Sequence, residues 1–388
     1  MPTYADRVAP FGTTIFSEIN TLAQEYNALN LSQGRPDFDG PQVMLEAAID
    51  AIRTGKGNQY PPGVGIPEFK QAVAKHAQDH YGLPIDWQTG VIASAGASEG
   101  IYSAVLGVVN PGDEVILIEP YFDIYRPAVE WADAKPVFVP MRPPEWRIDE
   151  DELRAAFNDK TRAIILNTPH NPTGRVFDMD ELSLIAELCQ RYDTIVIADE
   201  VYEHLTYGDA KHIPISTLPG MFERTLTVSS AAKTFSVTGW KVGWVMGHPE
   251  LVTGAWRIRQ NISFAVNHPG QWGIVRAMEL GQAYYDEYQA MYTHKRALLS
   301  EALTGAGFKI SEPEGAFYIM ADFSDLFEGD DVAFTKHLIT EAEVACIPPS
   351  AFFCPEHKYI AHNHVRFTFC KRDEILEEAA QKLKKLRS

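Results

Sequence analysis

The sequence predicts an α/β fold, in which a mostly parallel sheet carries helices on both faces and a smaller α+β domain accompanies it. Three observations predict this class. A chain of 388 residues is longer than one hydrophobic core usually serves. Short apolar runs alternate with longer amphipathic stretches through the middle of the chain, as in parallel α/β proteins. The alternation then stops near Met278, where a second domain is expected.

Buried strands are expected at four short, nearly continuous apolar runs that end in polar, glycine or proline residues. These runs occupy 114–120, 162–169, 194–200 and 225–230. A helix is expected over 178–192, with Asp178 or Asp180 as its cap. Its apolar stripe consists of Leu182, Ile185 and Leu188 or Cys189.

The last third of the chain has a different pattern. A long polar helix over 278–307 precedes short strands within 315–323 and 364–369, and a charged helix over 371–388 ends the chain. We therefore expect a large domain over 46–279 and a small domain formed by 1–45 together with 280–388.

Composition narrows the classes of partner and the location. The 34 basic and 52 acidic side chains give a net charge of −18, which disfavours binding to nucleic acid and to anionic membranes. The four cysteines have no zinc-like spacing and suit a reducing compartment, so we expect no metal site. The first residues lack the basic and apolar segments of an export signal, and no run approaches the roughly 20 apolar residues of a membrane helix. We expect a cytoplasmic protein.

Polar residues follow the apolar runs, at the strand ends where open parallel sheets bind ligands. Gly96, Ala97 and Ser98 open a helix whose backbone N–H groups can bind an anion. Asn171 follows the second of the four runs, Asp199 lies at the end of the third and Lys233 follows the fourth. Most of these residues have an ordinary structural explanation as well. The segment 96–98 fits a tight turn, Asn171 fits an Asn-Pro turn, and Asp199 fits a carboxylate paired with an arginine or a helix N-terminus.

The stretch "SSAAKTFSVTGWKVGW" places Lys233 among small and aromatic residues. An unpaired ammonium is costly in such surroundings, so the lysine either extends to the surface or has its nitrogen bonded to a ligand. An anion-binding turn, a carboxylate, a hydroxyl and a lysine on one rim are what a phosphate-bearing pyridine aldehyde requires.

Here the chain resembles the pyridoxal-phosphate-dependent aminotransferases of fold type I, class I, along nearly its whole length. The resemblance rests on motifs that occur in order: "LSQGRPDFDGP", "NQYPPGVGIPEFK", "AGASEG", "EPYFDIY", "NTPHNPTG", "DEVYEHL", "SSAAKTFSVTGWKVGW", "PEGAFY" and "HVRFTF". Two of them look most like the kynurenine/glutamine and bacterial methionine aminotransferases. The resemblance implies a seven-stranded large sheet and pyridoxal 5'-phosphate as cofactor.

The resemblance also implies the residues that hold the cofactor. Lys233 would bond to the cofactor aldehyde and move the substrate proton, and Asp199 would keep the ring nitrogen protonated. The other implied contacts are Phe122 on the ring face, Asn171 and the catalytic Tyr202 at the ring hydroxyl, and Gly96, Ala97, Ser98, Ser230 and Lys241 at the phosphate. Many relatives carry arginine where this chain has Lys241. The lysine keeps the positive charge but lacks the bidentate fork of arginine. Tyr60 would reach the phosphate of the neighbouring subunit, so the enzyme would be a homodimer with shared sites.

Substrate binding is implied in the same way. Arg366 would clamp the α-carboxylate in a bidentate pair, helped by Gly34 and Asn171. The side-chain pocket would include Phe16, Tyr125 and, from the partner subunit, Phe264. No further arginine is apparent in the site, because Arg257 and Arg259 are expected on a helix surface. A neutral donor such as methionine, glutamine or an aromatic amino acid is therefore favoured, with a ping-pong transfer to a 2-oxo acid.

Other functions remain open at this point. The same site could eliminate a β leaving group from cysteine S-conjugates, or it could use aspartate as the donor. A transcriptional regulator with an aminotransferase-like domain is disfavoured, because "GRPDFD" begins at residue 34 and the net charge is −18. A binding protein with an inactive site is disfavoured because Lys233, Asp199 and Arg366 are all present.

Overall fold

The computed structural model describes residues 4–387, and within them lie a large sheet of eight strands, a small sheet of three strands and a separate two-stranded pair. The strands of the large sheet are, in spatial order, β2 (Val91–Ser94), β9 (Gly243–Gly247), β8 (Thr225–Ser230), β7 (Ile195–Asp199), β6 (Thr161–Asn167), β3 (Glu114–Glu119), β4 (Lys135–Arg142) and β5 (Arg147–Ile148). Six of these strands run in one direction, while β9 and β5 are antiparallel to their neighbours. The mostly parallel sheet is confirmed, and the eighth strand beyond the implied seven is the two-residue β5.

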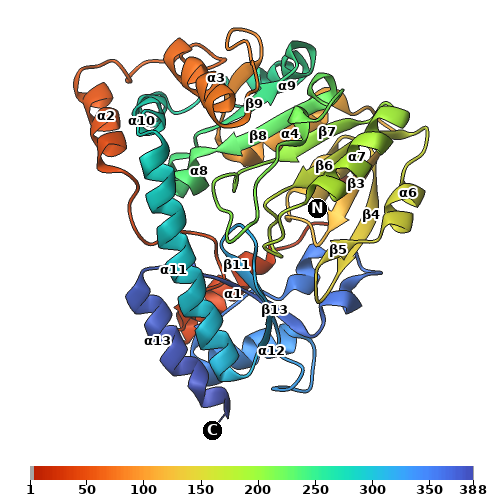
Figure 1. Ribbon diagram of the computed structural model, residues 1–388, viewed down its shortest axis with the longest axis vertical. Coiled ribbons are helices and arrows are strands. Elements are labelled where there is room, and N and C mark those ends of the chain that lie inside the picture. Colours follow the sequence, from red (N-terminus) through yellow and green to blue (C-terminus); the bar gives the residue numbers. More distant parts are fainter. Residues whose placement is uncertain (1–3, 388) are drawn as a thin grey trace.

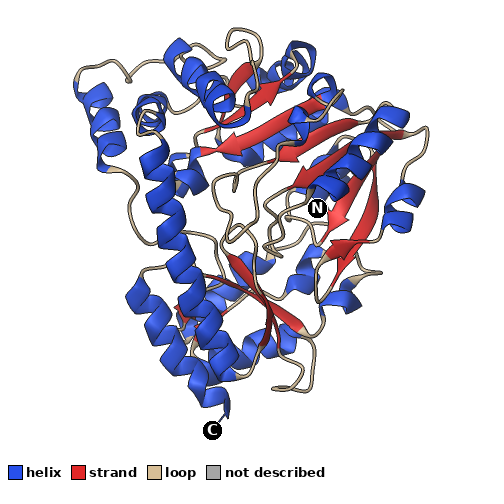
Figure 2. Ribbon diagram, viewed as in Figure 1, coloured by secondary structure: helices blue, strands red, loops and turns tan. Residues whose placement is uncertain are grey.

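Helices cover both faces of the large sheet (Figure 2). Alternate residues of β3 point to opposite faces, so Val115 and Leu117 join one core and Ile116 and Ile118 the other. The first core is completed by α4 (Gly96–Val108), α5 (Tyr125–Trp131) and α9 (Pro249–Ile262). The second core is completed by α6 (Glu150–Ala156) and α7 (Met179–Arg191). Both faces are thus apolar, which explains why the strands are continuous apolar runs.

Helix α7 lies where the sequence predicts a helix. Asp178 is its N-cap and accepts hydrogen bonds from the backbone N–H groups of Asp180 and Glu181. The Glu181 side chain accepts in return from the Asp178 backbone N–H, which completes a capping box. The expected apolar stripe, including Leu182 and Ile185, is buried against the sheet.

The small sheet consists of β10 (Lys309–Ser311), β11 (Tyr318–Asp322) and β13 (His364–Thr368), all antiparallel. Long helix α11 (Gln282–Ala306) runs from the level of α10 (His268–Met278) to that of α13 (Asp373–Leu383), as Figure 1 shows. The expected start of this helix at Met278 is wrong. Met278 ends α10, and Gly281, with φ +71°, separates the two helices.

The N-terminal segment packs against the C-terminal part of the chain. Strand β1 (Leu29–Asn30) pairs in parallel with β12 (Val344–Ala345). Helix α1 (Ile15–Glu25) buries Ile19 and Ala23 with Ile347 and Phe352. This packing accords with the expected small domain, whose boundaries at 45/46 and 279/280 stay a prediction.

The remaining helices are short or peripheral. The α-helices are α2 (Gln42–Arg53), α3 (Pro67–Tyr81), α8 (Ala231–Thr234) and α12 (Asp331–His337). The 3-10 helices are η1 (Asp6–Val8), η2 (Ile215–Thr217), η3 (Phe222–Arg224), η4 (Thr238–Trp240), η6 (Pro349–Phe352), η7 (Lys358–Ala361) and η8 (Lys384–Arg387), and η5 (Leu338–Ala342) is a π-helix. Within residues 4–387, no helix has the length and apolar character needed to cross a bilayer.

Candidate active site

Two adjoining cavities lie at the carboxyl ends of β6, β7 and β8. The first is lined by Gly96, Ala97, Ser98, Phe122, Ile124, Tyr125, Asn167, Asn171, Asp199, Val201, Tyr202, Ser230, Ala232, Lys233, Thr238, Lys241 and Tyr318. The second, which opens toward solvent, is lined by Phe16, Gln33, Gly34, Arg35, Phe122, Asp123, Asn171, Lys233, Tyr318 and Arg366. Phe122, Asn171, Lys233 and Tyr318 line both, so the cavities form one continuous site. The strand-end residues selected from the sequence meet here.

The N-terminus of α4 forms a cradle at one end of the first cavity. Gly96 has φ +75°, and a Cβ at this position would lie 3.2 Å from Lys241 Nζ. Gly243 must also be small, because a Cβ there would lie 2.8 Å from the Gly96 carbonyl carbon. The helix N-terminus, the Lys241 ammonium and the Ser230 side chain thus surround one spot. This arrangement suits a phosphate group.

Asp199 ends β7 at the floor of the first cavity and is 4 % exposed. Its Oδ2 accepts a hydrogen bond from the Tyr125 hydroxyl at 2.6 Å, and its Oδ1 accepts from the Val201 backbone N–H at 3.4 Å. Burial raises the pKa of Asp199 to about 6, although these hydrogen bonds and Lys233 oppose the rise. A cation placed at this carboxylate would restore its ordinary charged state.

Lys233 lies in the short helix α8, directly after β8, and its side chain faces both cavities. Its Nζ donates a hydrogen bond to the Gly34 carbonyl at 3.0 Å and lies 5.6 Å from the centre of the Tyr202 ring. Burial lowers the pKa of Lys233 to about 8. The neutral amine that a nucleophile requires is therefore more accessible near neutral pH than in an ordinary lysine.

Arg366 on β13 is 1 % exposed and reaches the second cavity from the small sheet. Its Nη1 donates to Asn171 Oδ1 at 2.8 Å and its Nη2 donates to the Ser32 carbonyl at 2.6 Å. Its Nε has no hydrogen-bond partner within residues 4–387. A buried guanidinium whose hydrogen bonds all end on neutral oxygens is suited to an incoming carboxylate.

Three contributors to the site have no role in the sequence analysis. The Tyr318 hydroxyl lies 3.1 Å from that of Tyr202, and its ring lies 4.2 Å from the Arg366 guanidinium. Asn167 donates to the Asp199 carbonyl at 2.8 Å and accepts from the Asn171 backbone N–H at 2.8 Å. Asp123 lines the second cavity. Asn167 ends a predicted strand, so the strand-end rule could have found it, whereas Tyr318 requires the small sheet to be placed.

Tyr125 has a different contact from the one expected. The sequence analysis placed it in the side-chain pocket of the substrate, but its hydroxyl donates to Asp199 beneath the first cavity. It does not line the second cavity, where Arg366 and Phe16 lie. The reason is that α5 begins at Tyr125 and packs against the sheet, which buries the side chain at 3 % exposure.

Tyr60 and Phe264 lie outside both cavities of their own chain. They are 80 % and 58 % exposed, and their rings pack edge to face with centroids 5.3 Å apart. Arg259, expected on the helix surface, is instead fully buried. Its guanidinium pairs with Glu99 of α4 at 3.4 Å and donates to the Phe264 carbonyl at 3.2 Å.

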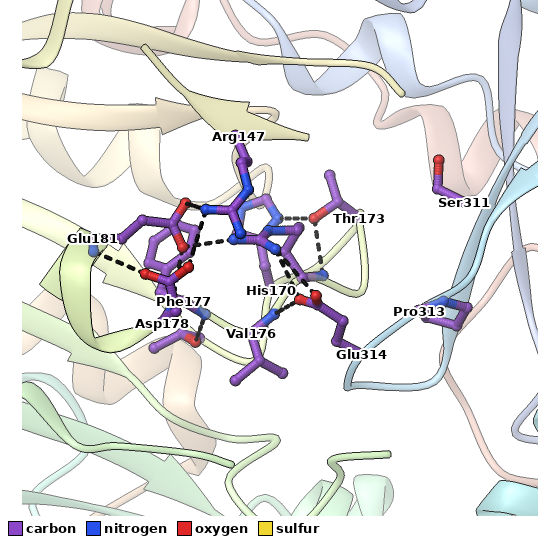
Figure 3. Close-up of polar contacts among 12 residues, drawn as sticks. Arg147, His170, Thr173, Val176, Phe177, Asp178, Glu181, Ser311, Pro313 and Glu314 are labelled. Atoms are coloured by element: carbon purple, nitrogen blue, oxygen red, sulfur yellow. Dashed lines mark hydrogen bonds and ion pairs between the residues drawn. The ribbon is translucent and has the colours of Figure 1, made fainter. Parts of the chain in front are cut away.

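The loop that carries Asn171 is anchored by an ion-pair network, shown in Figure 3. Arg175 Nη1 contacts both carboxylate oxygens of Glu314, at 3.0 and 3.1 Å, and its Nη2 contacts Glu181 at 2.6 Å. Arg147 pairs with Asp178 at 3.0 Å. The network joins the loop after β6 to the segment that precedes β11, and so to the elements that carry Asn171 and Tyr318.

Comparison with known proteins identifies the class. Residues 26–383 match the family model "Aminotransferase class I and II". The chain belongs to this family. It is therefore a pyridoxal-phosphate-dependent transaminase with the fold type I architecture.

The relatives of this chain are named for different substrates. The chain is 43 % identical over 385 residues to a probable N-succinyldiaminopimelate aminotransferase of Mycobacterium tuberculosis, with 97 % of each chain covered. It is 39 % identical to the kynurenine–oxoglutarate transaminase of Dictyostelium discoideum, covering 98 % of this chain and 96 % of that one. A solved Escherichia coli structure, described as identifying a methionine aminotransferase function, has a TM-score of 0.94 at 33 % identity, covering 99 % and 100 % of the two chains.

Proposed function

We propose that the two cavities together form the active site, with the cofactor in the first and the amino acid substrate in the second. The observation that carries this proposal is the position of Lys233, whose amine faces both cavities and has a pKa lowered to about 8. When bound, pyridoxal phosphate supplies an electron-accepting ring that stabilises negative charge at the substrate Cα.

The residues of the first cavity fit this cofactor. The α4 N-terminus, Ser230 and Lys241 would hold the phosphate. Asp199 would hold the ring nitrogen, and the cationic nitrogen would offset the desolvation that raises the pKa of this carboxyl. Phe122 would pack on the ring, and Asn171 and Tyr202 would bind its hydroxyl oxygen. Lys233 would form the covalent link and, once released, carry the proton to and from the substrate Cα.

The second cavity supports a neutral amino donor. Arg366 would bind the α-carboxylate, because its buried guanidinium meets only neutral oxygens. Phe16 lies over this guanidinium at 5.4 Å and packs against Phe352 at 5.8 Å, so the donor side chain would meet aromatic surface. Methionine, glutamine and aromatic amino acids fit this lining, with a 2-oxo acid as acceptor in a ping-pong reaction.

A second candidate donor is a longer amino acid with a distal carboxylate. Arg35 is exposed and lines the second cavity together with Arg366. The similarity to the probable N-succinyldiaminopimelate aminotransferase supports a donor of this kind. Elimination from cysteine S-conjugates would use the same residues as transamination.

The homodimer is part of the proposal. Two aromatic rings that pack on each other are rarely left exposed unless they contact a partner. Tyr60 and Phe264 form an exposed pair of this kind. We infer that Tyr60 reaches the phosphate end of the partner subunit's first cavity and that Phe264 reaches its second.

Chains with Lys233→Ala and chains with Tyr60→Ala should each be impaired. Refolded together as mixed dimers, they should regain activity, because one of the two sites is then intact. No recovery would reject the shared site.

Two experiments test the site and the donor. Borohydride reduction of the cofactor-loaded enzyme, followed by digestion and mass spectrometry, should place a pyridoxyl group on Lys233. Its absence there would overturn the proposal.

Steady-state kinetics should then give a higher kcat/KM for methionine, glutamine or phenylalanine than for aspartate. Highest activity with N-succinyldiaminopimelate, lost in Arg35→Gln but not in Phe16→Leu, would favour the second candidate instead.

A further inference from the structure

Three histidines gather outside the two cavities described above. His76 and His80 are four residues apart on α3, so their side chains project from the same face of that helix. His204 comes from the turn after β7, five residues beyond Asp199. The ring centroids of His76 and His80 are 4.5 Å apart, and each lies 5.0 Å from that of His204.

The spacing of the ring nitrogens is close to that of a metal site. One nitrogen from each histidine can be chosen so that all three lie within 4.8 Å of one another. The Nε2 atoms of His76 and His204 are 2.7 Å apart. Two imidazole ligands on a tetrahedral zinc ion are about 3.3 Å apart, given a metal–nitrogen distance of about 2.05 Å. Small rotations of the three rings would therefore bring the nitrogens into ligand positions.

A carboxylate lies beside the three imidazoles. Glu203 Oε2 lies 3.9 Å from His76 Nε2 and 4.0 Å from His204 Nε2. A divalent cation among the three rings would find nitrogen donors and a neighbouring carboxylate.

The carboxylate and one imidazole are held in place by further contacts. Tyr81 donates its hydroxyl hydrogen to Glu203 Oε2 at 2.8 Å, and Ser229 donates to Glu203 Oε1 at 3.0 Å. The His204 ring stacks on Tyr285 of α11 with centroids 3.9 Å apart. Such supporting contacts orient the ligands of metal sites and tune their affinity.

A groove connects the cluster with solvent. His76 and His80 line it together with Asp79 on α3 and with Glu279 and Tyr285 from the region of α10 and α11. An ion can therefore reach His76 and His80 without passing through the active-site cavities, whereas His204 does not line this groove.

We propose that His76, His80 and His204 form a binding site for a transition-metal dication of the zinc class, with Glu203 as the neighbouring counter-charge. The site departs from the expectation, based on cysteine spacing, that the chain has no metal site. A bound ion would join α3 to the turn after β7, the strand whose last residue is Asp199. The alternative is a direct hydrogen bond between two neutral imidazoles, His76 and His204.

The test uses the cofactor-loaded enzyme after dialysis against EDTA, with Zn²⁺ alone as the probe. Isothermal titration should show one equivalent per chain with a dissociation constant near or below about 1 μM. Zn²⁺ should raise the melting temperature, because it binds the folded state. Co²⁺ should give the visible absorption of a tetrahedral complex with nitrogen ligands, while the cofactor band stays unchanged.

His80→Gln is the decisive variant, because His80 is half-buried and takes no part in the 2.7 Å contact. It should fold without metal as the wild type does, and weaken Zn²⁺ binding at least about tenfold. Glu203→Gln should weaken binding by about 10- to 100-fold without removing the Co²⁺ absorption. His362→Gln, a change at an exposed histidine, should bind as the wild type does. Absence of one-to-one binding, equal affinity in His80→Gln, or binding that abolishes the cofactor band would overturn the proposal.

Discussion

Two buried arginines flank the loop between β6 and α7, and their surroundings differ. Arg175, at the end of the loop nearest α7, meets two carboxylates, Glu181 at 2.6 Å and Glu314 at 3.0 Å. Arg366 meets Asn171 in the same loop and the Ser32 carbonyl, both neutral groups. In the described part of the chain, Arg366 forms no ion pair within 4.0 Å. Burial consequently lowers the pKa of Arg366.

This difference distinguishes buried charges that stabilise the fold from buried charges that bind a ligand. A buried cation with carboxylate partners holds parts of the chain together, and removing it leaves buried anions behind. A buried cation without an anion is unfavourable by itself and recovers that free energy when an anionic ligand binds. This criterion supports placing Arg366 and Lys233 in the proposed active site and the Arg175 network in its support. Asp199 is the corresponding anionic case, a buried carboxylate whose hydrogen bonds come from neutral donors. Each prediction below tests that division.

Lys233→Ala should have the largest effect. It removes both the nucleophile and the proposed proton carrier, so kcat should fall by at least about 10³-fold. The visible absorption band of the lysine-bound cofactor should be lost. Lys70→Ala is a matched control, because Lys70 is also buried and donates to a backbone carbonyl, that of Gln88 at 2.9 Å. The control should keep the band. A band that survives in Lys233→Ala would contradict the proposed site.

Arg366→Lys should come next in size. The substitution keeps the positive charge but removes the planar fork, so the α-carboxylate loses its bidentate partner. We expect kcat/KM to fall by about 10²-fold, mainly through KM, while the cofactor band stays intact. Steady-state kinetics with the preferred donor measures this split. An unchanged KM would show that Arg366 does not bind the substrate.

Arg175→Gln should reverse the pattern, with a loss of stability and little loss of activity. It leaves the mostly buried Glu181, whose side chain is 13 % exposed, without its closest cation, and Glu314 is partly exposed, so the free energy of unfolding should fall by about 2 kcal/mol. Glu314→Gln, at the exposed partner, should cost less than about 1 kcal/mol. Urea unfolding followed by fluorescence measures both. If KM rises in Arg175→Gln as much as in Arg366→Lys, the distinction between the two arginines fails.

The sequence predicted the central elements of the fold because their physics is local. The runs that became β3, β6, β7 and β8 are apolar on both faces, and α7 carries its own capping box. The register of β5 and the start of α11 were not predictable in this way. A two-residue strand has no periodicity, and the break before α11 depends on the positive φ of Gly281.

The site was predictable where it follows strand ends and not where it depends on packing between distant segments. Asp199, Asn171 and Lys233 lie at or just after the ends of predicted strands, and the structure brings them to one cavity. Tyr318 reaches that cavity only because the small sheet packs beside it. The contact between Tyr125 and Asp199 joins residues 74 positions apart in the sequence, and no local pattern indicates it.

Tyr125→Phe gives the smallest expected effect and the sharpest test of that contact. The Tyr125 hydroxyl donates to Asp199 and so lowers the pKa of a carboxyl that burial has raised to about 6. Removing the donor should raise this pKa further in the cofactor-free protein, and the proposed site needs the carboxylate ionised to hold the ring nitrogen. Binding of pyridoxal phosphate to the cofactor-free variant should therefore be about tenfold weaker than in the wild type near pH 6 and should approach the wild-type affinity at high pH. Tyr192→Phe, at a ring that packs on Phe157, should leave the pH dependence of binding unchanged. An unchanged affinity near pH 6 in Tyr125→Phe would mean that the hydroxyl does not set the charge of Asp199.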